Sequence, residues 1–405
     1  MKVSKKRMLA VVAALVVFAM IATGCSGGST GSAGKTGATA KTIDIGIGAP
    51  LTAGAVALGQ GMKRGTLLAI AQANASKEAK SLGITFKGVD GDDQGDPKTG
   101  VTVANTFTSD PKLLGVMGHL NSGVSIPASK VYAAKKIVMI SPASTSPALT
   151  QQGLTNVFRV CTTDAVQGPA AADYATKLLG MKSAYVVDDS TPYGEGLASE
   201  FAKRFTANGG RVLGTAKTSD KDSDFNALVT KMKGLSPDVI YYGGIYNAGA
   251  LLAKQSKDAG MKAPLMSGDG LYDKAFIELA GASAAEGDFA TSVGLPIDKL
   301  PKGQDFTAAF KAMFPGRDIA AYDAYAYDAT NVIINAILAA AKTDGLDKLT
   351  TPTGRDTIIA NVAATKAPGV TGEIAFDPKG DTTNKAISLY VVQGGKWATK
   401  AAAGQ

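Results

Sequence analysis

The sequence predicts an α/β protein of two lobes, each built on a parallel β-sheet. Apolar strand-like runs alternate with helical runs along the whole chain, and repeated β–α–β units give parallel sheets that helices cover. The alternation comes in two series, which indicates two similar lobes. The folded part, from about Lys41 to Ala398, is also longer than one hydrophobic core usually holds.

The first series runs from residue 43 to residue 141. Asp96 is a natural N-cap, and Pro97 stands at the first helical position, where its missing N–H is not needed. The expected strands are Ile43–Ala49, Ile84–Val89, 113–117 and 137–141, and the expected helices are Gly61–Ala75, Pro97–Thr108 and 124–135.

The second series runs from residue 183 to residue 267. Its expected strands are 183–188, 211–216, 237–242 and 264–267, and its expected helices are 194–207, 223–233 and 247–259. Helices at 303–314, 322–342 and 353–364 and strands at Glu373–Phe376 and Ala386–Val392 complete the chain.

No Pro/Gly-rich linker separates the two series, so we expect the chain to cross between the lobes near 161–163, 293–297 and 380–385. Such crossings act as a hinge, with a binding cleft between the lobes. The expected N-terminal lobe is 41–162 with 297–383, and the expected C-terminal lobe is 163–296 with 384–405.

Residues 1–24 have the pattern of an export signal. A basic start precedes an apolar run of 15 residues, Met8–Ala22, and small residues lead to Cys25. A membrane-spanning helix needs roughly 20 residues. The pattern resembles a bacterial lipoprotein signal with Cys25 as the lipid-bearing residue, although Ala22 stands where Leu is more frequent. A plain signal peptide or membrane anchor is the alternative. Residues 25–40 have the composition of a flexible tether.

Charge and cysteine content narrow the possible partners. Removing residues 1–24 takes away four basic groups and lowers the formal charge from +8 to +4. No dense Lys/Arg run follows the signal, so we expect no nucleic-acid binding. With lipid on Cys25, Cys161 has no partner for a disulfide. Its apolar surroundings predict a buried strand thiol.

The groups that catalysis or a cofactor would need are scarce. His119 is the only histidine and directly follows a strand, which favours a structural or cleft-lining role. The chain has no Walker loop and no Cys/His metal cluster, and the stretch that begins Gly46-Ile-Gly48 lacks the third glycine of a dinucleotide fingerprint. The acidic run Asp90–Asp96 hints at a calcium loop, but Val101 stands where the closing Glu is needed. We expect no enzyme, cofactor or metal.

Two strand ends rich in hydroxyl groups indicate a binding site. Residues 118–125, Gly-His-Leu-Asn-Ser-Gly-Val-Ser, and residues 140–147, Ile-Ser-Pro-Ala-Ser-Thr-Ser-Pro, each follow an apolar strand-like run. Ligands of open α/β sheets bind beyond the carboxyl ends of strands. Short hydroxyl side chains and backbone N–H groups there suit a small carboxylate.

The motifs resemble those of type I periplasmic binding proteins of the leucine/isoleucine/valine-binding group. These proteins are the receptors of ABC importers, and they have two Rossmann-like lobes. The resemblance covers about residues 41–398, and the order and spacing of the motifs carry it. The matching pieces are Gly91-Asp-Asp93, Asp96-Pro97, Gly118-His-Leu120, Pro127-Ala-Ser129, Met139-Ile-Ser-Pro142, Thr145, Pro147, Leu149-Thr150, Gln167-Gly-Pro169, Tyr193-Gly-Glu-Gly196, Tyr241-Tyr-Gly-Gly244 and Ala285-Glu-Gly287.

The resemblance implies contacts for an amino acid in the first lobe. Ser122 matches a serine that holds the α-carboxylate with its hydroxyl and N–H. Thr145 matches a threonine that contacts carboxylate and ammonium, and Ala143 matches a residue that offers its carbonyl to the ammonium. Ser144, between them, would contribute backbone.

The second lobe supplies two further positions. Tyr193 matches an aromatic residue that closes over the ligand, and Asp269 matches an acid that pairs with the ammonium. Related receptors often have Glu at this position, so the pairing geometry can differ here. A zwitterion in a closed cleft loses its hydration, and both of its charged ends need partners.

The side-chain pocket is where this sequence departs from the family. Leu58 and Ile245 stand where leucine receptors often carry aromatic residues, and Tyr322 keeps an aromatic at the rim. Asn121 and Gly95 replace a pair of half-cystines. Leu58 and Ile245 favour an aliphatic ligand side chain, whereas Asn121 admits a polar one.

We therefore expect a monomeric receptor, held at the outer face of the cell membrane by lipid on Cys25, that passes a branched-chain amino acid to an ABC permease and its ATPase subunits. One alternative keeps the fold but binds another small solute, such as an amide, urea or an aromatic acid. Another is a ligand sensor with a signalling partner.

Overall fold

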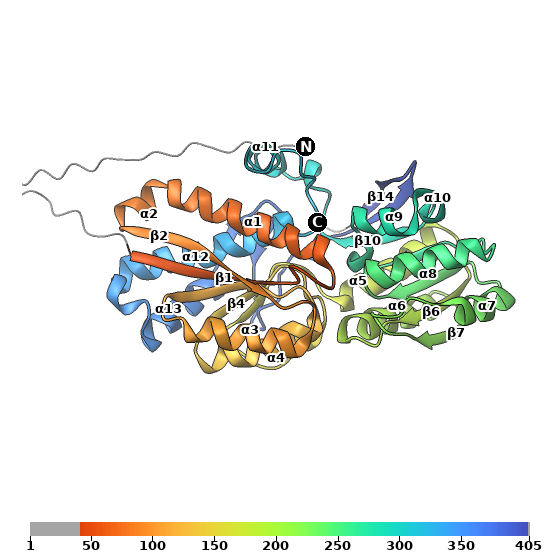
Figure 1. Cartoon of the computed structure of the whole chain (residues 1–405), viewed down its shortest axis with the longest axis horizontal. Coiled ribbons are helices and arrows are strands. Elements are labelled where there is room, and N and C mark those ends of the chain that lie inside the picture. The colour runs from red at the N-terminus through yellow and green to blue at the C-terminus, as the bar shows by residue number, and fades with distance from the viewer. Residues whose placement is uncertain (1–40, 404–405) are drawn as a thin grey trace, which may run out of the picture. The chain divides into compact units, whose positions relative to one another are not determined.

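The computed structural model describes residues 41–403 (Figure 1). The signal, Cys25 and the tether predicted from the sequence lie outside these residues. Within the described part, none of the helices combines the length and the apolar character that crossing a membrane requires.

The N-terminal lobe is built on a five-stranded parallel sheet in the order β2-β1-β3-β4-β5. Every residue of β3 and β4 is buried, as expected for parallel strands covered on both faces. The strands are β1 (Lys41–Ala49), β2 (Ile84–Asp92), β3 (Leu113–Gly118), β4 (Val138–Ser141) and β5 (Val157–Arg159).

Helices cover both faces of this sheet. In Figure 1, α1 (Val56–Ala75) and α12 (Asp323–Asp344) lie over one face, and α3 (Pro97–Ser109) and α4 (Ser122–Ala134) lie over the other. The remaining elements that pack with this lobe are α2 (Lys77–Ser81), α11 (Gly303–Met313), α13 (Pro352–Ala363), β11 (Lys366–Pro368) and β12 (Glu373–Ala375).

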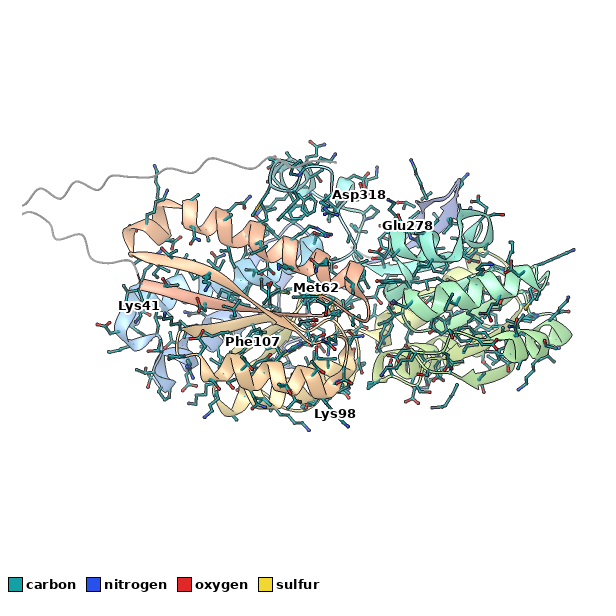
Figure 2. The ribbon with its side chains drawn as sticks, viewed as in Figure 1. Lys41, Met62, Lys98, Phe107, Glu278 and Asp318 are labelled. Carbon is teal, nitrogen blue, oxygen red and sulfur yellow. The ribbon has the colours of Figure 1, made fainter. Side chains whose placement is uncertain are left out.

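The core of this lobe has two halves, one on each face of the sheet. Met62 and Phe107 are buried in different apolar clusters, whereas Lys98 points outward (Figure 2). The Phe107 ring fits against the sheet because Gly46 and Gly91 have no side chain: a Cβ at either position would lie less than 3 Å from the ring.

The C-terminal lobe is built on a seven-stranded sheet in the order β14-β13-β10-β9-β8-β6-β7. Five strands are parallel, but β13 pairs antiparallel with β10 and β14 pairs antiparallel with β13. The strands are β6 (Ser183–Asp188), β7 (Arg211–Lys217), β8 (Val239–Gly243), β9 (Leu265–Ser267), β10 (Phe289–Val293), β13 (Ile387–Gln393) and β14 (Lys396–Ala403).

Helices also cover this second sheet. Helices α5 (Asp164–Asp173) and α6 (Pro192–Ala207) pack together on one side. The others are α7 (Asn226–Leu235), α8 (Tyr246–Asp258), α9 (Lys274–Ala280) and α10 (Ala282–Ala285). Two 3₁₀ turns, η1 (Pro147–Leu149) and η3 (Asp269–Leu271), follow β4 and β9.

The α/β class and the two lobes agree with the prediction, and each expected strand and helix has a counterpart within a few residues. The sheet of the C-terminal lobe is the exception to the purely parallel expectation, because its last two strands are antiparallel. The predicted N-cap is present: the Asp96 side chain accepts the Thr99 N–H at 2.8 Å.

The chain passes between the lobes three times, between β5 and α5, between β10 and α11, and between β12 and β13. Residues on these crossings therefore connect both halves of any site that lies between the sheets.

Candidate ligand-binding site

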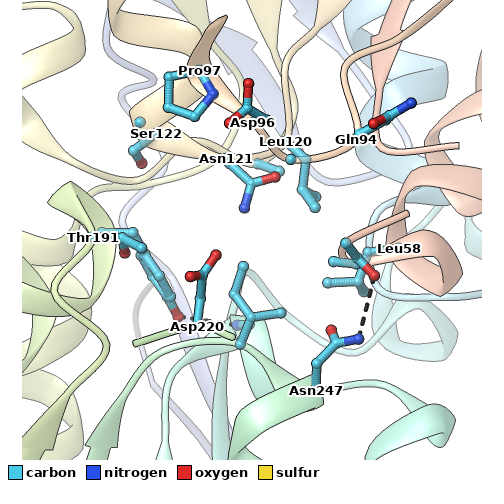
Figure 3. A pocket seen from close by; sticks show the side chains of 18 of the residues that line it. Leu58, Gln94, Asp96, Pro97, Leu120, Asn121, Ser122, Thr191, Asp220 and Asn247 are labelled. Carbon is cyan, nitrogen blue, oxygen red and sulfur yellow. Dashed lines mark hydrogen bonds between the residues drawn. The ribbon is translucent and has the colours of Figure 1, made fainter. Parts of the chain in front are cut away.

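A cleft of about 650 Å³ lies where strand ends from both sheets meet (Figure 3). Its walls come from the segments that follow β1, β2, β3 and β4 in one lobe and β6, β7, β8 and β9 in the other. This is the edge at which open α/β sheets bind their ligands. Its size suits a small molecule.

The N-terminus of α4 forms one corner of this cleft. Ser122 opens the helix directly after β3 and is 2% exposed. Its Oγ accepts the Ser146 N–H at 3.2 Å, so its own hydroxyl proton remains available for a ligand. No side chain caps the helix, and its first N–H groups carry the positive end of the helix dipole. The corner suits a carboxylate.

The N-terminus of α6 approaches this corner from the other lobe. Gly123 allows the approach, because a Cβ there would lie 3.3 Å from Cδ of Pro192. The Thr191 side chain caps α6 by accepting the Gly194 N–H at 3.0 Å. Tyr193, the next residue along the helix after Pro192, is thereby held at the wall of the cleft.

The loop after β4 forms the back wall. Ala143 lines the cleft, and none of the hydrogen bonds among residues 41–403 uses its carbonyl. Ser144 and Thr145 are fully buried behind it and do not line the cleft. The Ser144 N–H donates to Oγ of Ser141 at 2.9 Å. Ser144 and Thr145 thus both stand behind the wall rather than at its surface, and the ligand contacts expected of them stay predictions.

Arg159 holds this loop from beneath. Its side chain is fully buried, and its Nη1 donates to the carbonyls of Ser144 at 2.6 Å and Ser146 at 2.9 Å. Its Nε lies 2.6 Å from Oδ1 of Asp381, which is on the third crossing between the lobes. The back wall of the cleft is therefore tied to a segment that crosses between the lobes.

Asp269 supplies a buried acid opposite the α4 corner. It is 1% exposed and stands at the start of η3, after β9. Its carboxylate accepts the hydroxyl of Tyr193 at 2.9 Å and that of Tyr322 at 2.5 Å. With the Gln167 amide nitrogen turned toward Asp269, a third donor lies 3.0 Å away. Burial raises the pKa of Asp269, and these donors oppose the rise.

Tyr322 joins the lobes at this acid, and Tyr193 contacts the acid from within the C-terminal lobe. The Tyr193 hydroxyl also accepts the Gly270 N–H at 3.0 Å, so the ring is held in place. Tyr322, predicted at the rim of the side-chain pocket, lines the cleft and donates to Asp269 from just before α12 of the other lobe. Gln167, whose role the sequence did not indicate, completes the network.

Apolar residues line another part of the cleft. Leu58, Leu120 and Ile245 come from both lobes, and Asn121 lies beside Leu120 (Figure 3). The Asn121 carboxamide lies against Gly95, since a Cβ at Gly95 would be 3.5 Å from the Asn121 Oδ1. Asn121 and Gly95, which stand in place of the two half-cystines, are therefore in contact.

The mouth of the cleft is polar, and sequence reasoning missed its residues. Gln94 and Asp96 come from one lobe, and Asp220 and Lys221 from the other. Hydrogen bonds from Thr99 lower the pKa of Asp96, and the charge of Lys221 adds to the effect.

His119 and Cys161 lie outside this cleft. His119 is fully buried, with Nδ1 2.6 Å from Oδ2 of Asp93 and Nε2 2.8 Å from the Tyr132 hydroxyl. Cys161 is a buried free thiol whose pKa burial raises. Within residues 41–403, no group of three or more His, Cys, Asp or Glu side chains is arranged to hold a metal ion.

Two sheets joined by three crossings, with a cleft between a helix N-terminus and a buried acid, define a two-lobed solute-binding protein. Residues 42–396 match the family model of the periplasmic binding proteins, so the chain belongs to that family. The family and fold predicted from the sequence are confirmed, and the family is one of binding proteins, not of enzymes.

Relatives of known name agree. The Leu/Ile/Val-binding protein homolog 2 of Brucella abortus (strain 2308) is 36% identical over 352 residues, which cover 86% of this chain and 89% of the relative. Two solved structures are similar as well. The leucine binding protein LivK from Thermotoga maritima has a TM-score of 0.81 and 29% identity, covering 89% of this chain and 99% of that one. The substrate binding protein LivJ of a branched-chain amino acid transporter from Streptococcus pneumoniae, in complex with isoleucine, has a TM-score of 0.79 and 25% identity, covering 90% and 99%.

Proposed function

We propose that this protein captures a branched-chain amino acid between its lobes and delivers it to the permease of an ABC importer. The observation that carries the proposal is the pairing of the α4 N-terminus at Ser122 with the buried acid Asp269 in one cleft. A zwitterionic amino acid has a group that suits each of these two partners. Its carboxylate suits the α4 N-terminus, and its ammonium suits Asp269.

Each predicted contact has a defined part in this proposal. Ser122 donates to the carboxylate, and Thr145 turns toward the ligand from behind the wall. Ala143 offers its carbonyl to the ammonium and Asp269 its charge, while Tyr193 and Tyr322 hold that acid in place. Ser144 supports the loop.

The side chain of the ligand would lie among Leu58, Leu120 and Ile245, with Asn121 beside it. Their apolar surfaces favour an aliphatic group, since burying it removes apolar area from water. The names of the relatives, which specify leucine, isoleucine and valine, support the same class.

The place of the protein in the cell follows from the same proposal. An export signal would carry it across the membrane, and lipid on Cys25 would hold it as a monomer at the outer face. Lobe closure around the ligand would present a surface to the permease, which its ATPase subunits drive. In this proposal the two moving bodies are the N-terminal lobe, 41–162 with 297–383, and the C-terminal lobe, 163–296 with 384–405.

Calorimetric titration with leucine, isoleucine, valine and a panel of other amino acids tests the ligand class. We expect binding of the three aliphatic amino acids and weaker heats from the rest. Failure of every amino acid to bind would contradict the proposal and favour another small solute.

The variant Asp269→Asn tests the role of the acid. It keeps the shape of the side chain but removes the charge that meets the ammonium, so leucine affinity should fall by about 30-fold or more. Calorimetry measures the loss, and thermal unfolding shows whether the variant is folded. An amide, urea or aromatic acid ligand, which has no ammonium, would bind the variant nearly as well as the parent.

A further inference from the structure

One buried acid beside the cleft has no partner among residues 41–403. Asp164, the first residue of α5, has none of its surface exposed. Neither of its carboxylate oxygens makes a hydrogen bond in the described part of the chain. An isolated charge in a protein interior is strongly unfavourable unless another group compensates it. The ligand contacts proposed above leave Asp164 unexplained.

Asp164 is fixed directly behind Thr145. Its backbone N–H donates to the Thr145 carbonyl at 2.9 Å. The Thr145 hydroxyl is also fully buried and reaches no hydrogen-bond partner in the described part. Burial raises the pKa of Asp164 well above its usual value, and the nearby Thr145 hydroxyl opposes that rise. The two groups therefore lie close, without a completed bond.

The surroundings of the Asp164 carboxyl come from several elements. On α6, Gly196 lies next to it, since a Cβ there would be in ordinary van der Waals contact, 3.6 Å from its Oδ2. The Tyr241 hydroxyl from β8 is likewise buried without a partner among residues 41–403. The charged or titratable groups that act on or respond to Asp164 are Asp269 on η3, Arg159 on β5, Cys161 between β5 and α5, Glu200 and Tyr193 on α6, and Tyr241 on β8.

We propose that Asp164 is a positioning residue for the ammonium group of the ligand. By accepting the Thr145 hydroxyl proton, it leaves the lone pairs of that oxygen for the ammonium. It also adds a second negative charge near Asp269. This inference rests on the proposed amino-acid ligand, because a ligand without an ammonium would leave Asp164 uncompensated.

Ligand capture then involves a proton. In the empty protein, burial without a completed hydrogen bond favours the protonated Asp164 carboxyl, and the charge of Arg159 opposes this only in part. The arriving ammonium favours the ionised carboxylate, and the proton passes from Asp164 to the solvent. Affinity rises with pH up to the pH at which the empty protein loses that proton, since binding releases it.

Calorimetry with L-leucine in phosphate and in Tris, at about pH 7, measures this proton. The two buffers take up protons with different heats, so proton release appears as a difference between the titrations. Asp164→Asn should bind leucine about 10- to 100-fold more weakly and release fewer protons than the parent. Thr145→Val should lose affinity similarly, and Thr145→Ser, which keeps the hydroxyl, should retain it. The double variant should bind no more weakly than the worse single variant.

Asp288→Asn is the matched control. Asp288 is another buried acid with a raised pKa, but it stands at the start of β10 and does not line the cleft. Its variant should keep the affinity and the proton release of the parent.

The outcomes separate the two proposals. Parental affinity and proton release in Asp164→Asn would overturn the inference and leave the proposed function standing. If the parent binds none of leucine, isoleucine and valine, both fail. Should Asp164→Asn not fold, the Thr145 variants decide, because unchanged affinity in Thr145→Val overturns the inference.

Discussion

Buried carboxyls in this protein differ in how many donors surround them. Asp328 accepts the N–H groups of Val370 and Thr371 and the Thr371 hydroxyl. Asp288 accepts a single N–H, from Leu265 at 2.7 Å, and its Oδ2 has no partner among residues 41–403. Burial raises the pKa of Asp288 to about 8, so the acid is held mostly in its neutral form at neutral pH.

Asp288→Asn should therefore stabilise the protein, and more so at higher pH. Between about pH 4 and pH 8, the folded protein holds a proton that the unfolded chain has released, so the unfolding free energy of the parent falls by about 1.4 kcal/mol per pH unit from this group. Asparagine does not titrate and can still accept the Leu265 N–H. Urea unfolding of both proteins at several pH values measures the difference. A difference that does not change with pH would show that Asp288 titrates normally.

The sequence predicts much of the candidate site because its motifs fix which strand ends carry which side chains. Ser122, Ala143, Tyr193 and Asp269 all line the cleft. Gln167 belongs to one of the motifs that carry the family resemblance, but nothing in the sequence shows that its amide faces Asp269. Residues at the mouth, such as Lys221, could not be found, because their position depends on how the two lobes approach each other.

Two helices begin with the same local sequence, and only one of them faces the cleft. Helix α6 starts Thr191-Pro192-Tyr-Gly194 and helix α13 starts Thr351-Pro352-Thr-Gly354. In both, the threonine accepts the glycine N–H, at 3.0 Å in α6 and 3.2 Å in α13. The same capping chemistry thus supports a site helix and a purely structural one.

Replacing either threonine by alanine should cost about 1 kcal/mol of stability. Only Thr191→Ala should also weaken leucine binding, because α6 holds Tyr193 at the wall of the cleft. Chemical unfolding and calorimetry, applied to Thr191→Ala and Thr351→Ala together, separate the effects. Equal affinities in the two variants would mean that the start of α6 does not position the ligand site.

Elements with clear periodicity or caps could be predicted, whereas those made by tertiary pairing could not. Helix α5 contains Gly168 and Pro169, which normally interrupt helices. Strand β14 is rich in alanine, a poor strand former, and forms because it pairs with β13. Strand β10, which has only five residues, lies between β9 and β13 and pairs with both. In each case neighbours in space override the local preference of the sequence.

In the whole molecule, direct hydrogen bonds connect the two lobes. The Ala57 N–H donates to the Tyr246 hydroxyl at 3.1 Å, and the Asn247 amide donates to the Gly54 carbonyl at 3.3 Å. Tyr322, just before α12 of the N-terminal lobe, donates to Asp269 of the other lobe. These bonds join the lobes directly, through residues of the chain itself.

Tyr246→Phe should shift the empty protein toward more open forms, because it removes one bond between the lobes. We expect a larger radius of gyration by small-angle X-ray scattering and a loss of up to about fivefold in leucine affinity. With saturating leucine the two proteins should scatter alike.

Tyr174→Phe is the control for the loss of a hydroxyl. The Tyr174 hydroxyl donates to the Ile387 carbonyl at 3.0 Å within the C-terminal lobe. Its variant should not change the radius of gyration. Identical scattering from empty Tyr246→Phe and the parent would show that this bond does not restrain the lobes.

The position of α12 has a consequence for how the chain folds during its synthesis. This helix packs on β3, β4 and α1 of the N-terminal lobe, yet it ends only at Asp344. Until the ribosome has released α12, one face of the sheet lacks the apolar side chains that cover it, Ile333 and Ile337 among them. Exposed apolar surface of this kind attracts chaperones and other nascent chains. The lobe that is translated first is therefore the one that must wait longest to close its core.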